Sequence, residues 1–489
     1  MNNQLKNAYN PETFRALGHE LIDLLANHLE QTINGKSKVI NWKTPTEQLR
    51  YWQDNLGKEQ SLKELFSDIL NNSTAIHHPK YAGHQVGATV PVAALADLLG
   101  ALINNGMAIY EMGAASSAIE KVVTELICRQ IGYDNESDGF ITSGGSLANL
   151  TALLAARKAK SDKDTWMEGN NEKLGVMVSS EAHYCIDRAL RIMGFGNKGI
   201  IKIPVNKNFS MNTDLLEENL QAALKQGIKV IAVAGSAPST ATGMYDNLLE
   251  TGRFCKKHNL WFHVDGAHGG AAIFSSKYRH LLHGLEMADS VVIDAHKMMM
   301  TPVLTTFLLF KNKNHSYATF NQNAQYLFSQ QGDEEWYNYA KRTFECTKLM
   351  MGVRFYAIIK AHGTNIFDEF VTRQYDIGRA FAKVINQHPA FELLLPPDSN
   401  IICFRYRRKN LSEKSLNNLN ATLRQRILED GKFYIVQTQI AGNTWFRISI
   451  MSPFTEIATL EELLQYITEL ADNDYAQVDS DTNGKDDKC

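Results

Sequence analysis

The sequence predicts an α/β protein built on a mainly parallel, helix-covered sheet, with a smaller α+β unit near the carboxyl end. Between residues 175 and 310, short apolar runs typical of buried strands alternate with helix-forming segments. Two of these runs end directly in a carboxylate, at Asp265 and Asp294. In open α/β sheets, the loops that leave the carboxyl ends of parallel strands form the ligand site. We therefore expect a binding site at that edge of the sheet.

Length and composition are those of an ordinary globular protein. The chain has 489 residues, 44% hydrophobic and 21% charged, which predicts two or three domains. A net charge of −3 gives no electrostatic reason to expect nucleic acid or an anionic membrane as a partner. The sequence contains no uninterrupted run of about 20 apolar residues, so a transmembrane helix is not expected. The amino-terminal stretch lacks the apolar core of a signal peptide, which favours a cytoplasmic location.

Cysteines and histidines give no sign of a metal site. The six cysteines are scattered without a CxxC pair, which indicates reduced thiols rather than a disulfide framework or a zinc site. His77, His78 and His84 lie close together in the sequence, but their spacing fits no compact ligand set and acidic partners are missing. We therefore expect no bound metal.

Amphipathic helices are predicted at the amino end. Apolar residues recur at helical spacing from Pro11 to Glu30, with Asn10 as a plausible N-cap. A second amphipathic segment spans about Ser61–Leu70. Two such helices cannot bury their apolar faces alone, so we expect them to pack on another subunit, with packing on the same chain as the alternative.

A βα series is predicted to follow, with helical segments such as Asp214–Lys225 and Leu248–His258 between several strands. Strands are expected at Gly175–Ser179, Ile200–Ile203, Val230–Ala234, Trp261–Val264, Val291–Ile293 and Leu304–Phe310. After a helix from about Gly352 to Ala361, a smaller unit is expected, with strands at Ile401–Arg405, Lys432–Thr438 and Trp445–Ser449 and helices at Ser415–Glu429 and Leu460–Leu470.

An acid and a lysine are expected to meet at neighbouring strand ends. Asp265 closes one apolar run, and Lys297 follows the next in the word DAHKMM. This pairing suits pyridoxal 5′-phosphate (PLP), whose aldehyde needs a lysine amine and whose pyridine nitrogen needs a carboxylate partner. The arrangement resembles the fold-type I PLP enzymes. The words HVDGAHGG and DAHKMM resemble the group II amino-acid decarboxylases, and the likeness extends from the His-Pro segment at residue 78 to Arg447.

The resemblance implies a PLP-dependent transferase-like fold, with a mainly parallel seven-stranded sheet in the large domain and a smaller carboxyl-terminal α+β domain. It also implies a homodimer in which the amino-terminal arm is exchanged between subunits. Residues 1–75 are then expected to form the arm, 76–352 the PLP-binding domain and 353–471 the small domain. Residues 472–489 are acidic and polar, which predicts a disordered tail.

The phosphate site is expected where a glycine-rich turn opens a helix. The stretch Gly139–Ser146 leads into the Ala- and Leu-rich segment Leu147–Lys160, and glycines there let backbone N–H groups approach an anion. Most such turns are simply tight turns. This one resembles the phosphate-binding loop of the family, which implies that Gly145 and Ser146 bind the phosphate. No GxGxxG or GxxxxGK[ST] word occurs at this junction, which disfavours dinucleotide and P-loop sites.

Further cofactor contacts follow from the same resemblance. His183 is expected to stack on the cofactor ring, although a histidine in a loop is commonly structural, and Ala267 is expected on the opposite ring face. Ser239 is expected to bond the phenolic oxygen of the cofactor or a neighbouring group. Asp265 has two possible roles, partner of the pyridine nitrogen or helix N-cap, and its pairing with Lys297 favours the first.

Two residues beside the lysine are expected to support the phosphate or to orient the lysine. These are Asp294 and His296. The family often has asparagine where Asp294 stands. Because two anions repel unless a proton or a water intervenes, a direct bond from this carboxylate to phosphate is not expected.

Substrate contacts are expected from two further segments. The resemblance places Tyr81, His84 and Gln85 at the substrate mouth, with a polar loop over the core as the structural alternative. Arg447, in the word WFRISIMSP, resembles the carboxyl-domain arginine that points toward substrate. An arginine on an alternating strand also often faces solvent.

The segment Phe320–Gly352 resembles the mobile catalytic loop of the family, whose tyrosine returns a proton to the substrate after CO₂ leaves. It contains the word Tyr326-Leu327-Phe328-Ser329 and then two more tyrosines. Spacing back from Cys346 fits Tyr337 in glutamate-type members and Tyr339 in aromatic-type members, so both are catalytic candidates. Simple packing of both tyrosines remains the alternative.

The implied activity is PLP-dependent decarboxylation of an L-amino acid to an amine, the reaction of a carboxy-lyase. Lys80, His84 and Arg447 favour an acidic substrate: glutamate, aspartate or cysteine sulfinate. Aromatic amino acids and 2,4-diaminobutyrate remain open, as does a related PLP-dependent lyase or aldehyde synthase. The intact set of cofactor residues argues against a non-catalytic relative, and the missing glycine fingerprint argues against a nicotinamide enzyme.

Overall fold

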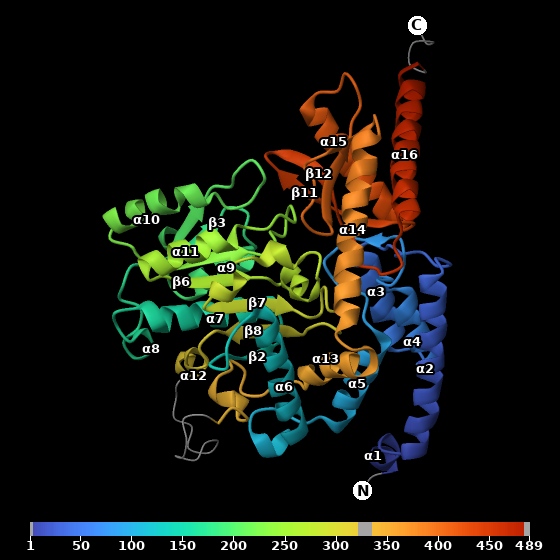
Figure 1. Ribbon diagram of the computed structural model, residues 1–489. Coiled ribbons are helices and arrows are strands. Elements are labelled where there is room, and N and C mark those ends of the chain that lie inside the picture. Colours follow the sequence, from blue (N-terminus) through green and yellow to red (C-terminus); the bar gives the residue numbers. More distant parts are fainter. Residues whose placement is uncertain (1–2, 321–334, 484–489) are drawn as a thin grey trace. The chain divides into compact units, whose positions relative to one another are not determined.

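The computed structural model describes residues 3–320 and 335–483, with side chains as far as residue 473 (Figure 1). The chain divides into two compact units. The large unit comprises Gln85–Arg379 and Pro397–Ile401. The terminal unit combines the described residues up to His84 with Ala380–Pro396 and those from Ile402 onward. Within the described ranges, no helix has the length and apolar character needed to cross a membrane.

A seven-stranded sheet forms the centre of the large unit, in the order β2-β8-β7-β6-β5-β3-β4. Only β8 runs antiparallel to its neighbours, which confirms the predicted mainly parallel sheet. The strands are β2 (Asp138–Thr142), β3 (Leu174–Ser179), β4 (Ile200–Ile203), β5 (Lys229–Ser236), β6 (Trp261–Asp265), β7 (Ser290–Asp294) and β8 (Thr306–Phe310).

The strand register brings polar residues together at one edge of this sheet. Ser236, the last residue of β5, pairs with Asp265, the last residue of β6. Asp265 in turn pairs with Val292 of β7, so Asp294 ends its strand two residues further on. Thr306 opens β8 directly opposite Asp294. The predicted meeting of strand ends is therefore present.

Helices flank the large sheet. They are α5 (Pro91–Ile103), α6 (Ala114–Ile131), α7 (Gly145–Lys160), α8 (Thr165–Glu168), α9 (Tyr184–Ile192), α10 (Leu216–Lys225), α11 (Leu248–His258), α12 (Asn314–Thr319), α13 (Met351–His362) and α14 (Asn365–Gln387) as far as Arg379. Short 3₁₀ turns lie at Tyr110–Met112, Asn197–Gly199, Thr213–Leu215, Gly269–Phe274, Arg279–Leu282, Leu285–Met287 and Tyr339–Lys341.

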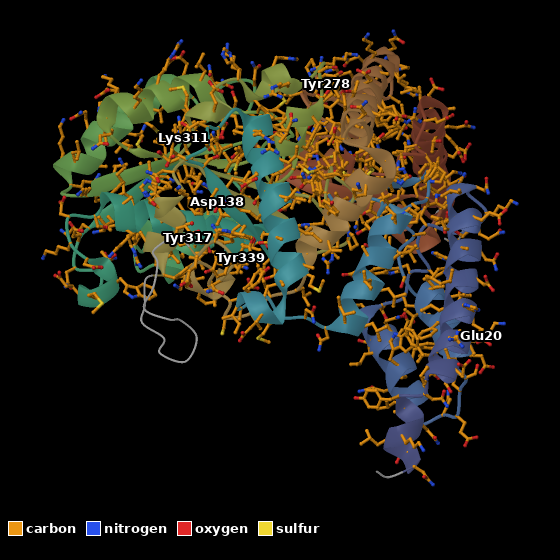
Figure 2. The ribbon with its side chains drawn as sticks, turned by 60° about the horizontal axis from the view of Figure 1, so that its bottom comes forward. Glu20, Asp138, Tyr278, Lys311, Tyr317 and Tyr339 are labelled. Atoms are coloured by element: carbon orange, nitrogen blue, oxygen red, sulfur yellow. The ribbon has the colours of Figure 1, made fainter. Side chains whose placement is uncertain are left out.

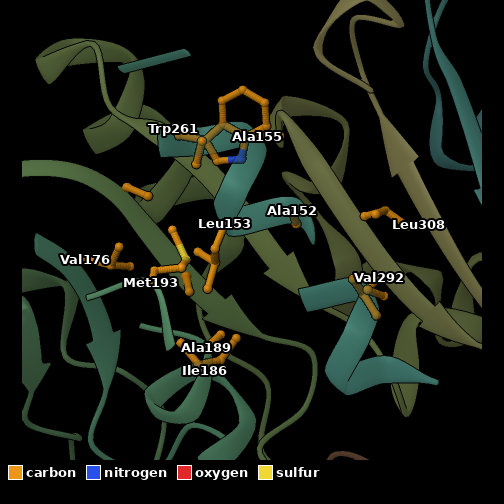
Figure 3. Close-up of a cluster of buried hydrophobic side chains, with 14 of the residues drawn as sticks. Ala152, Leu153, Ala155, Val176, Ile186, Ala189, Met193, Trp261, Val292 and Leu308 are labelled. Atoms are coloured by element: carbon orange, nitrogen blue, oxygen red, sulfur yellow. The ribbon is translucent and has the colours of Figure 1, made fainter. Parts of the chain in front are cut away.

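Helix α7 packs on the sheet and carries the functional turn at its amino end. Its Ala152 and Leu153 lie in a core with Val176, Trp261 and Val292 (Figure 3). All five side chains are at most 1% exposed. Small residues on α7 let it approach the strands closely, and its basic last turn is favourable at the negative end of the helix dipole.

The terminal unit is a five-stranded sheet with helices, in the order β1-β11-β12-β10-β9. Its strands are β1 (Tyr81–Ala82), β9 (Phe391–Leu393), β10 (Ile401–Tyr406), β11 (Tyr434–Ile440) and β12 (Asn443–Ser449). Its helices are α1 (Asn3–Ala8), α2 (Pro11–Ile33), α3 (Pro45–Leu56), α4 (Leu62–Asn71), α15 (Glu413–Asp430), α16 (Ile457–Asn483) and the end of α14.

The unit boundaries differ from the expected ones at residues 75 and 352. The amino-terminal segment is tied to the carboxyl-terminal sheet, because β1 pairs with β11 and the Val39 amide donates to the Gly431 carbonyl. Helix α13 (Met351–His362) runs across the expected boundary at residue 352 without a break, and the large unit continues to Arg379 within α14. Helix α16 continues to Asn483, so the tail expected to be disordered from Asp472 is helical that far, and residues 484–489 lie outside the described part.

Candidate active site

A cavity of about 210 Å³ lies at the carboxyl ends of β5, β6 and β7 in the large unit. Of the nine residues predicted to hold the cofactor, eight line it: Gly145, Ser146, His183, Asp265, Ala267, Asp294, His296 and Lys297. They come from four separate stretches of the chain. The parallel sheet brings those stretches to one edge, as expected for an open α/β fold.

Asp265 faces the cavity from the end of β6. Its Oδ1 accepts a hydrogen bond from the Ala267 N–H at 3.2 Å, so the carboxylate does hold the following turn. Burial raises the pKa of Asp265, while the nearby charges of Lys297 and His183 act to lower it. The carboxylate is therefore placed to interact with a positive charge inside the cavity.

The lysine is held by the acid that ends β7. The Nζ of Lys297 lies 3.0 Å from Oδ2 of Asp294, whose Oδ1 accepts a hydrogen bond from the Thr306 hydroxyl at 2.6 Å. Burial alone would raise the pKa of Asp294, but the charges of Lys297 and His296 and its hydrogen bonds hold that pKa below its ordinary value. Asp294 is thus an ionised carboxylate that orients the lysine amine.

The amino end of α7 is open toward the cavity. Gly144 precedes the helix with φ of 116°, a conformation that side chains rarely adopt, and no side chain caps this helix end within the described residues. A Cβ on Gly145 would lie 3.1 Å from a carboxylate oxygen of Asp294. The two glycines therefore leave backbone N–H groups accessible to an anion.

His183 caps the start of α9. Its Nδ1 accepts a hydrogen bond from the Cys185 N–H at 3.4 Å, and its ring lies 4.3 Å from that of Tyr184. Burial lowers the pKa of His183, and Lys297 lowers it further, against the opposite effects of Asp265 and Asp294. The ring is therefore a neutral imidazole at neutral pH, with its Nε2 carrying the proton.

Other residues that line the cavity were not predicted from the sequence. Asn149 lies one helical turn after Gly145, and this spacing could have identified it. Cys185 follows His183 by two residues, and His268 stands inside the word HVDGAHGG. Ser236 is the last residue of β5. It was missed because the predicted strand, Val230–Ala234, ended two residues earlier.

For Ser239, the structure shows a contact with a neighbouring group, the second of the two roles expected for it. Its side chain is 2% exposed, and its hydroxyl lies 3.3 Å from that of Thr242 within the same turn. The flanking residues Pro238 and Thr240 line the cavity instead. The turn is thus part of the wall, and a contact of Ser239 with the cofactor stays a prediction.

Of the two candidate tyrosines, Tyr339 is a packing residue. It is fully buried, its hydroxyl donates to the Ser117 carbonyl at 3.3 Å, and burial raises its pKa well above the usual value. Tyr339 is labelled in Figure 2. Tyr337 is half-buried, with its ring edge-on to Tyr110 and Trp336. Neither tyrosine is among the described residues that line the cavity of this chain.

The expected substrate residues are divided between the two units. Gln85 belongs to the large unit, whereas Tyr81, His84 and Arg447 belong to the terminal unit. Arg447, on β12, is only 6% exposed, so the solvent-facing alternative is wrong for it.

Within the terminal unit, Tyr81 and His84 are in contact, and two arginines act electrostatically on His84. The Tyr81 ring stacks on that of Tyr434, and its hydroxyl donates to the His84 carbonyl at 3.1 Å. Burial lowers the pKa of His84, and the charges of Arg447 and Arg424 lower it further.

A second cavity in the large unit, of about 300 Å³, offers no comparable chemistry. Its buried acid, Asp138, pairs with Lys121 at 3.0 Å and with Arg342 at 2.6 Å. Aromatic side chains of Tyr317 and Trp336 complete the wall. Because two ion pairs already neutralise Asp138, this acid is not available to pair with a bound cofactor. Within the described residues, no group of three or more potential metal ligands is placed to hold an ion.

The first cavity fits PLP. Its open helix end suits a phosphate, the glycine at position 145 keeps that end free of a side chain, and the Lys297 amine suits the aldehyde. Asp265 would pair with the pyridine nitrogen. His183 and Ala267 both line the cavity, an aromatic ring and a small side chain of the kind that flank a flat cofactor.

Comparisons with known proteins agree with this geometry. Residues 45–407 match the family model described as the pyridoxal-dependent decarboxylase conserved domain. An L-aspartate decarboxylase of Metarhizium robertsii is 30% identical, over 72% of this chain and 71% of that protein. An aromatic-L-amino-acid decarboxylase of Bacillus atrophaeus is 26% identical, over 94% and 95%.

The fold has close counterparts among solved structures. The crystal structure of mouse CSAD aligns with a TM-score of 0.87 at 23% identity, covering 94% of this chain and 99% of that one. Together with the family match over most of the chain, the pocket formed by Lys297 and Asp265 identifies the protein. The chain belongs to the pyridoxal-dependent decarboxylase family and is a PLP-dependent amino-acid decarboxylase, a carboxy-lyase.

Proposed function

We propose that the enzyme decarboxylates an acidic L-amino acid, namely aspartate, glutamate or cysteine sulfinate. The observation that carries the proposal is the pair of arginines in the terminal unit, Arg424 and Arg447, whose charges both lower the pKa of His84. Guanidinium groups bind carboxylates through paired, charge-assisted hydrogen bonds. The aspartate decarboxylase of Metarhizium robertsii supports this assignment, whereas the aromatic decarboxylase of Bacillus atrophaeus supports the alternative of an aromatic substrate.

Release of CO₂ from a panel of amino acids tests the proposal. We expect the highest kcat/KM with one of the three acidic substrates, and a higher value for an aromatic amino acid or for 2,4-diaminobutyrate would refute it. Arg424→Gln should raise KM for the acidic substrate about tenfold or more, since it removes a charge-assisted contact. Arg426→Gln, on the same helix, is the matched control. Measuring amine against aldehyde in the products separates decarboxylation from aldehyde synthesis.

The residues of the cavity have complementary roles in this reaction. Bound PLP supplies an electron-withdrawing ring that stabilises the negative charge left when CO₂ departs. Lys297 provides the amine that holds the cofactor covalently, and Asp294 orients that amine at 3.0 Å. Asp265 keeps a proton on the ring nitrogen, because a neighbouring carboxylate favours the protonated form. His183, neutral at the cavity wall, covers the ring without adding charge.

Tyr337 is the proposed proton donor after CO₂ has left. Its ring is half-buried, whereas Tyr339 is fixed in the core with a hydroxyl that is hard to ionise. Tyr326 stands in the same segment of family resemblance and lies outside the described residues. Phenylalanine at positions 326 and 337 should be compared. The proposal requires Tyr337→Phe to lose more kcat than Tyr326→Phe. An unchanged kcat in Tyr337→Phe would rule out Tyr337 as the proton donor.

The enzyme is proposed to be a homodimer. Helix α5 exposes five large apolar side chains at the spacing of one helical face: Leu95, Leu98, Leu99, Leu102 and Ile103, each 44–62% exposed. A contiguous apolar stripe of this kind marks a protein interface. A second copy of the chain would also cover the exposed apolar side chains of α2, such as Phe14 and Leu25.

Light scattering at assay concentration tests the dimer. Leu98→Glu should shift the chain toward monomer, whereas Met167→Glu, at an exposed apolar position on α8, should not. Because Tyr337 does not line the described cavity of its own chain, we expect it to act in the site of the partner. Mixed dimers of Lys297→Ala and Tyr337→Phe subunits should then regain activity. Failure to regain it would place each site within a single chain.

A cytoplasmic location is part of the proposal. It is supported by the cysteines, of which Cys128, Cys185, Cys255, Cys346 and Cys403 are free thiols. Fractionation of cells that express the tagged chain tests it, and recovery of the protein outside the cytoplasm would contradict it.

A further inference from the structure

One edge of the large sheet is held by charged side chains. In the described sheet β2 is the first strand of the order, so half of its backbone groups point away from its neighbour β8. The Ile141 N–H donates to Oε1 of Glu120 on α6 at 2.8 Å, and the Ile141 carbonyl accepts from Nζ of Lys348 at 2.7 Å. Glu120 and Lys348 are both buried and form an ion pair. One buried ion pair therefore bonds both backbone groups of Ile141.

Similar contacts continue along β2 toward the glycine turn. At the start of the strand, Arg342 donates to the Asp138 carboxylate at 2.6 Å and to the next carbonyl oxygen at 3.2 Å. Just beyond the end of the strand, the Ser143 hydroxyl donates to Oε1 of Glu345. Residues 342–348 therefore bond β2 at its start, near its end and at the residue before the turn. The contact of Glu345 with Ser143 is the one that stands next to the turn.

The glycine turn itself is conformationally permissive. Gly144 has a φ of 116°, and Gly145 opens α7, whose first N–H groups are open toward the cavity. Glycines let an anion approach such groups, but they also allow many other backbone conformations. Donors bind an anion tightly when they are held in place beforehand, because otherwise the ligand must order them as it binds. A restraint on the residue before Gly144 therefore affects how well the turn binds a phosphate.

We propose that Glu345 and Ser143 are positioning residues for the cofactor phosphate. Their hydrogen bond holds the end of β2, so that the N–H groups of the following turn are set for the phosphate before it binds. Neither residue lines the described cavity, so the effect is exerted through the backbone of the turn. The inference rests on the PLP site described above, and it does not depend on which amino acid is the substrate.

The charge of Glu345 alone predicts the opposite effect. A carboxylate near an anion site repels the anion, so its removal would strengthen phosphate binding if Glu345 acted only through its charge. If Glu345 acts by holding Ser143, removal of its side chain weakens phosphate binding. The sign of the change therefore separates positioning from electrostatics.

Two ligands that differ only in the phosphate measure the effect. Pyridoxamine 5′-phosphate and pyridoxamine do not form the covalent link to Lys297. The dissociation constant of pyridoxamine divided by that of pyridoxamine 5′-phosphate is the phosphate advantage, and equilibrium dialysis of the cofactor-free enzyme gives both values. A general loss of stability would weaken both ligands alike and leave this ratio unchanged.

Ser143→Ala and Glu345→Ala should each lower the phosphate advantage about tenfold, the effect of one lost charge-assisted hydrogen bond. The double variant should lose no more than either single variant, since both remove the same contact. Glu345→Gln keeps an oxygen that can accept from Ser143, so it should restore the wild-type ratio. Ser276→Ala is the matched control, because its exposed hydroxyl also donates to a carboxylate, that of Asp368 at 3.3 Å, in the same unit.

Three results would overturn the proposal. One is a wild-type phosphate advantage in Ser143→Ala, which is exposed and therefore expected to fold. Another is a higher advantage in Glu345→Ala, which would show that its charge acts rather than its contact. The third is a loss in the double variant equal to the two single losses combined. If the wild type binds neither pyridoxamine 5′-phosphate nor PLP, the cofactor site itself is wrong, and the proposal fails with it.

Discussion

His263 gives the structure a measurable sensitivity to acid. It lies on β6, two residues before the pocket residue Asp265, is fully buried, and has a hydrogen-bond partner for each ring nitrogen. Nε2 lies 2.7 Å from Oδ1 of Asn149, which lines the pocket, and Nδ1 lies 2.9 Å from the Ser290 hydroxyl. Trp261 Nε1 donates to the same hydroxyl at 2.9 Å, leaving the Ser290 proton for Nδ1. The network therefore suits a neutral imidazole.

The size of the effect follows from the pKa. Burial lowers the pKa of His263 from 6.5 to about 4. The unfolded chain therefore binds this proton more tightly than the folded chain, and stability falls as pH drops below about 6.5. Between pH 7 and pH 5 the loss assigned to His263 is about 2 kcal/mol.

The assay is urea unfolding of wild type and His263→Gln at pH 7 and pH 5. Wild type should lose about 2 kcal/mol more over this interval than the variant, which has no titrating ring. The other histidines whose pKa is lowered by burial, such as His183 and His315, contribute equally to both proteins. His263→Asn provides a second comparison if the Gln variant does not fold. Equal losses in wild type and in a folded variant would refute the reasoning.

Three further predictions concern the site and its support. Asp265→Asn should bind PLP but slow single-turnover decarboxylation about a hundredfold, equivalent to about 3 kcal/mol. A wild-type rate would mean that Asp265 serves only to cap the following turn. Tyr339→Phe should retain kcat, whereas Tyr337→Phe should lose it in stopped-flow and steady-state assays. Lys348→Met should destabilise the fold by about 3–5 kcal/mol in denaturant unfolding, because it leaves the buried Glu120 carboxylate without its ion-pair partner. Adding Glu120→Gln should recover much of that loss.

Much of the site could be predicted because its residues stand at strand ends and helix starts. Asp265 and Lys297 follow apolar runs that form β6 and β7 close to the predicted bounds. Gly145 and Ser146 open the helix that the Ala- and Leu-rich sequence predicts. Such positions are determined by local sequence pattern together with the rule that parallel strands end at one edge.

Contacts between distant segments could not be predicted in this way. The two-residue strand β1 exists because Tyr81 pairs with Tyr434, more than 350 residues away in the chain. Helix α3 was missed even though Thr44 and Glu47 form a capping box, because its apolar pattern is weak. Tyr339 is a core residue through its packing on Lys348, which sequence spacing does not reveal.

The side-chain direction within a turn was equally inaccessible. Ser239 and Thr240 are adjacent and chemically similar, yet only Thr240 lines the cavity. The choice depends on the backbone course of the turn after Pro238, where the preceding strand β5 ends. The resemblance of this segment to a family motif identified the turn after Pro238, but not which of its side chains lines the cavity.

The most direct test of the central claim is borohydride reduction of the PLP-loaded enzyme followed by peptide mapping. Reduction fixes the cofactor to the amine that holds it. The account predicts a single labelled peptide containing the word DAHKMMM, with the label on Lys297, and no label in Lys297→Ala. Label on any other lysine of the folded wild-type enzyme would contradict the assignment of the pocket between Asp265 and Asp294 as the active site.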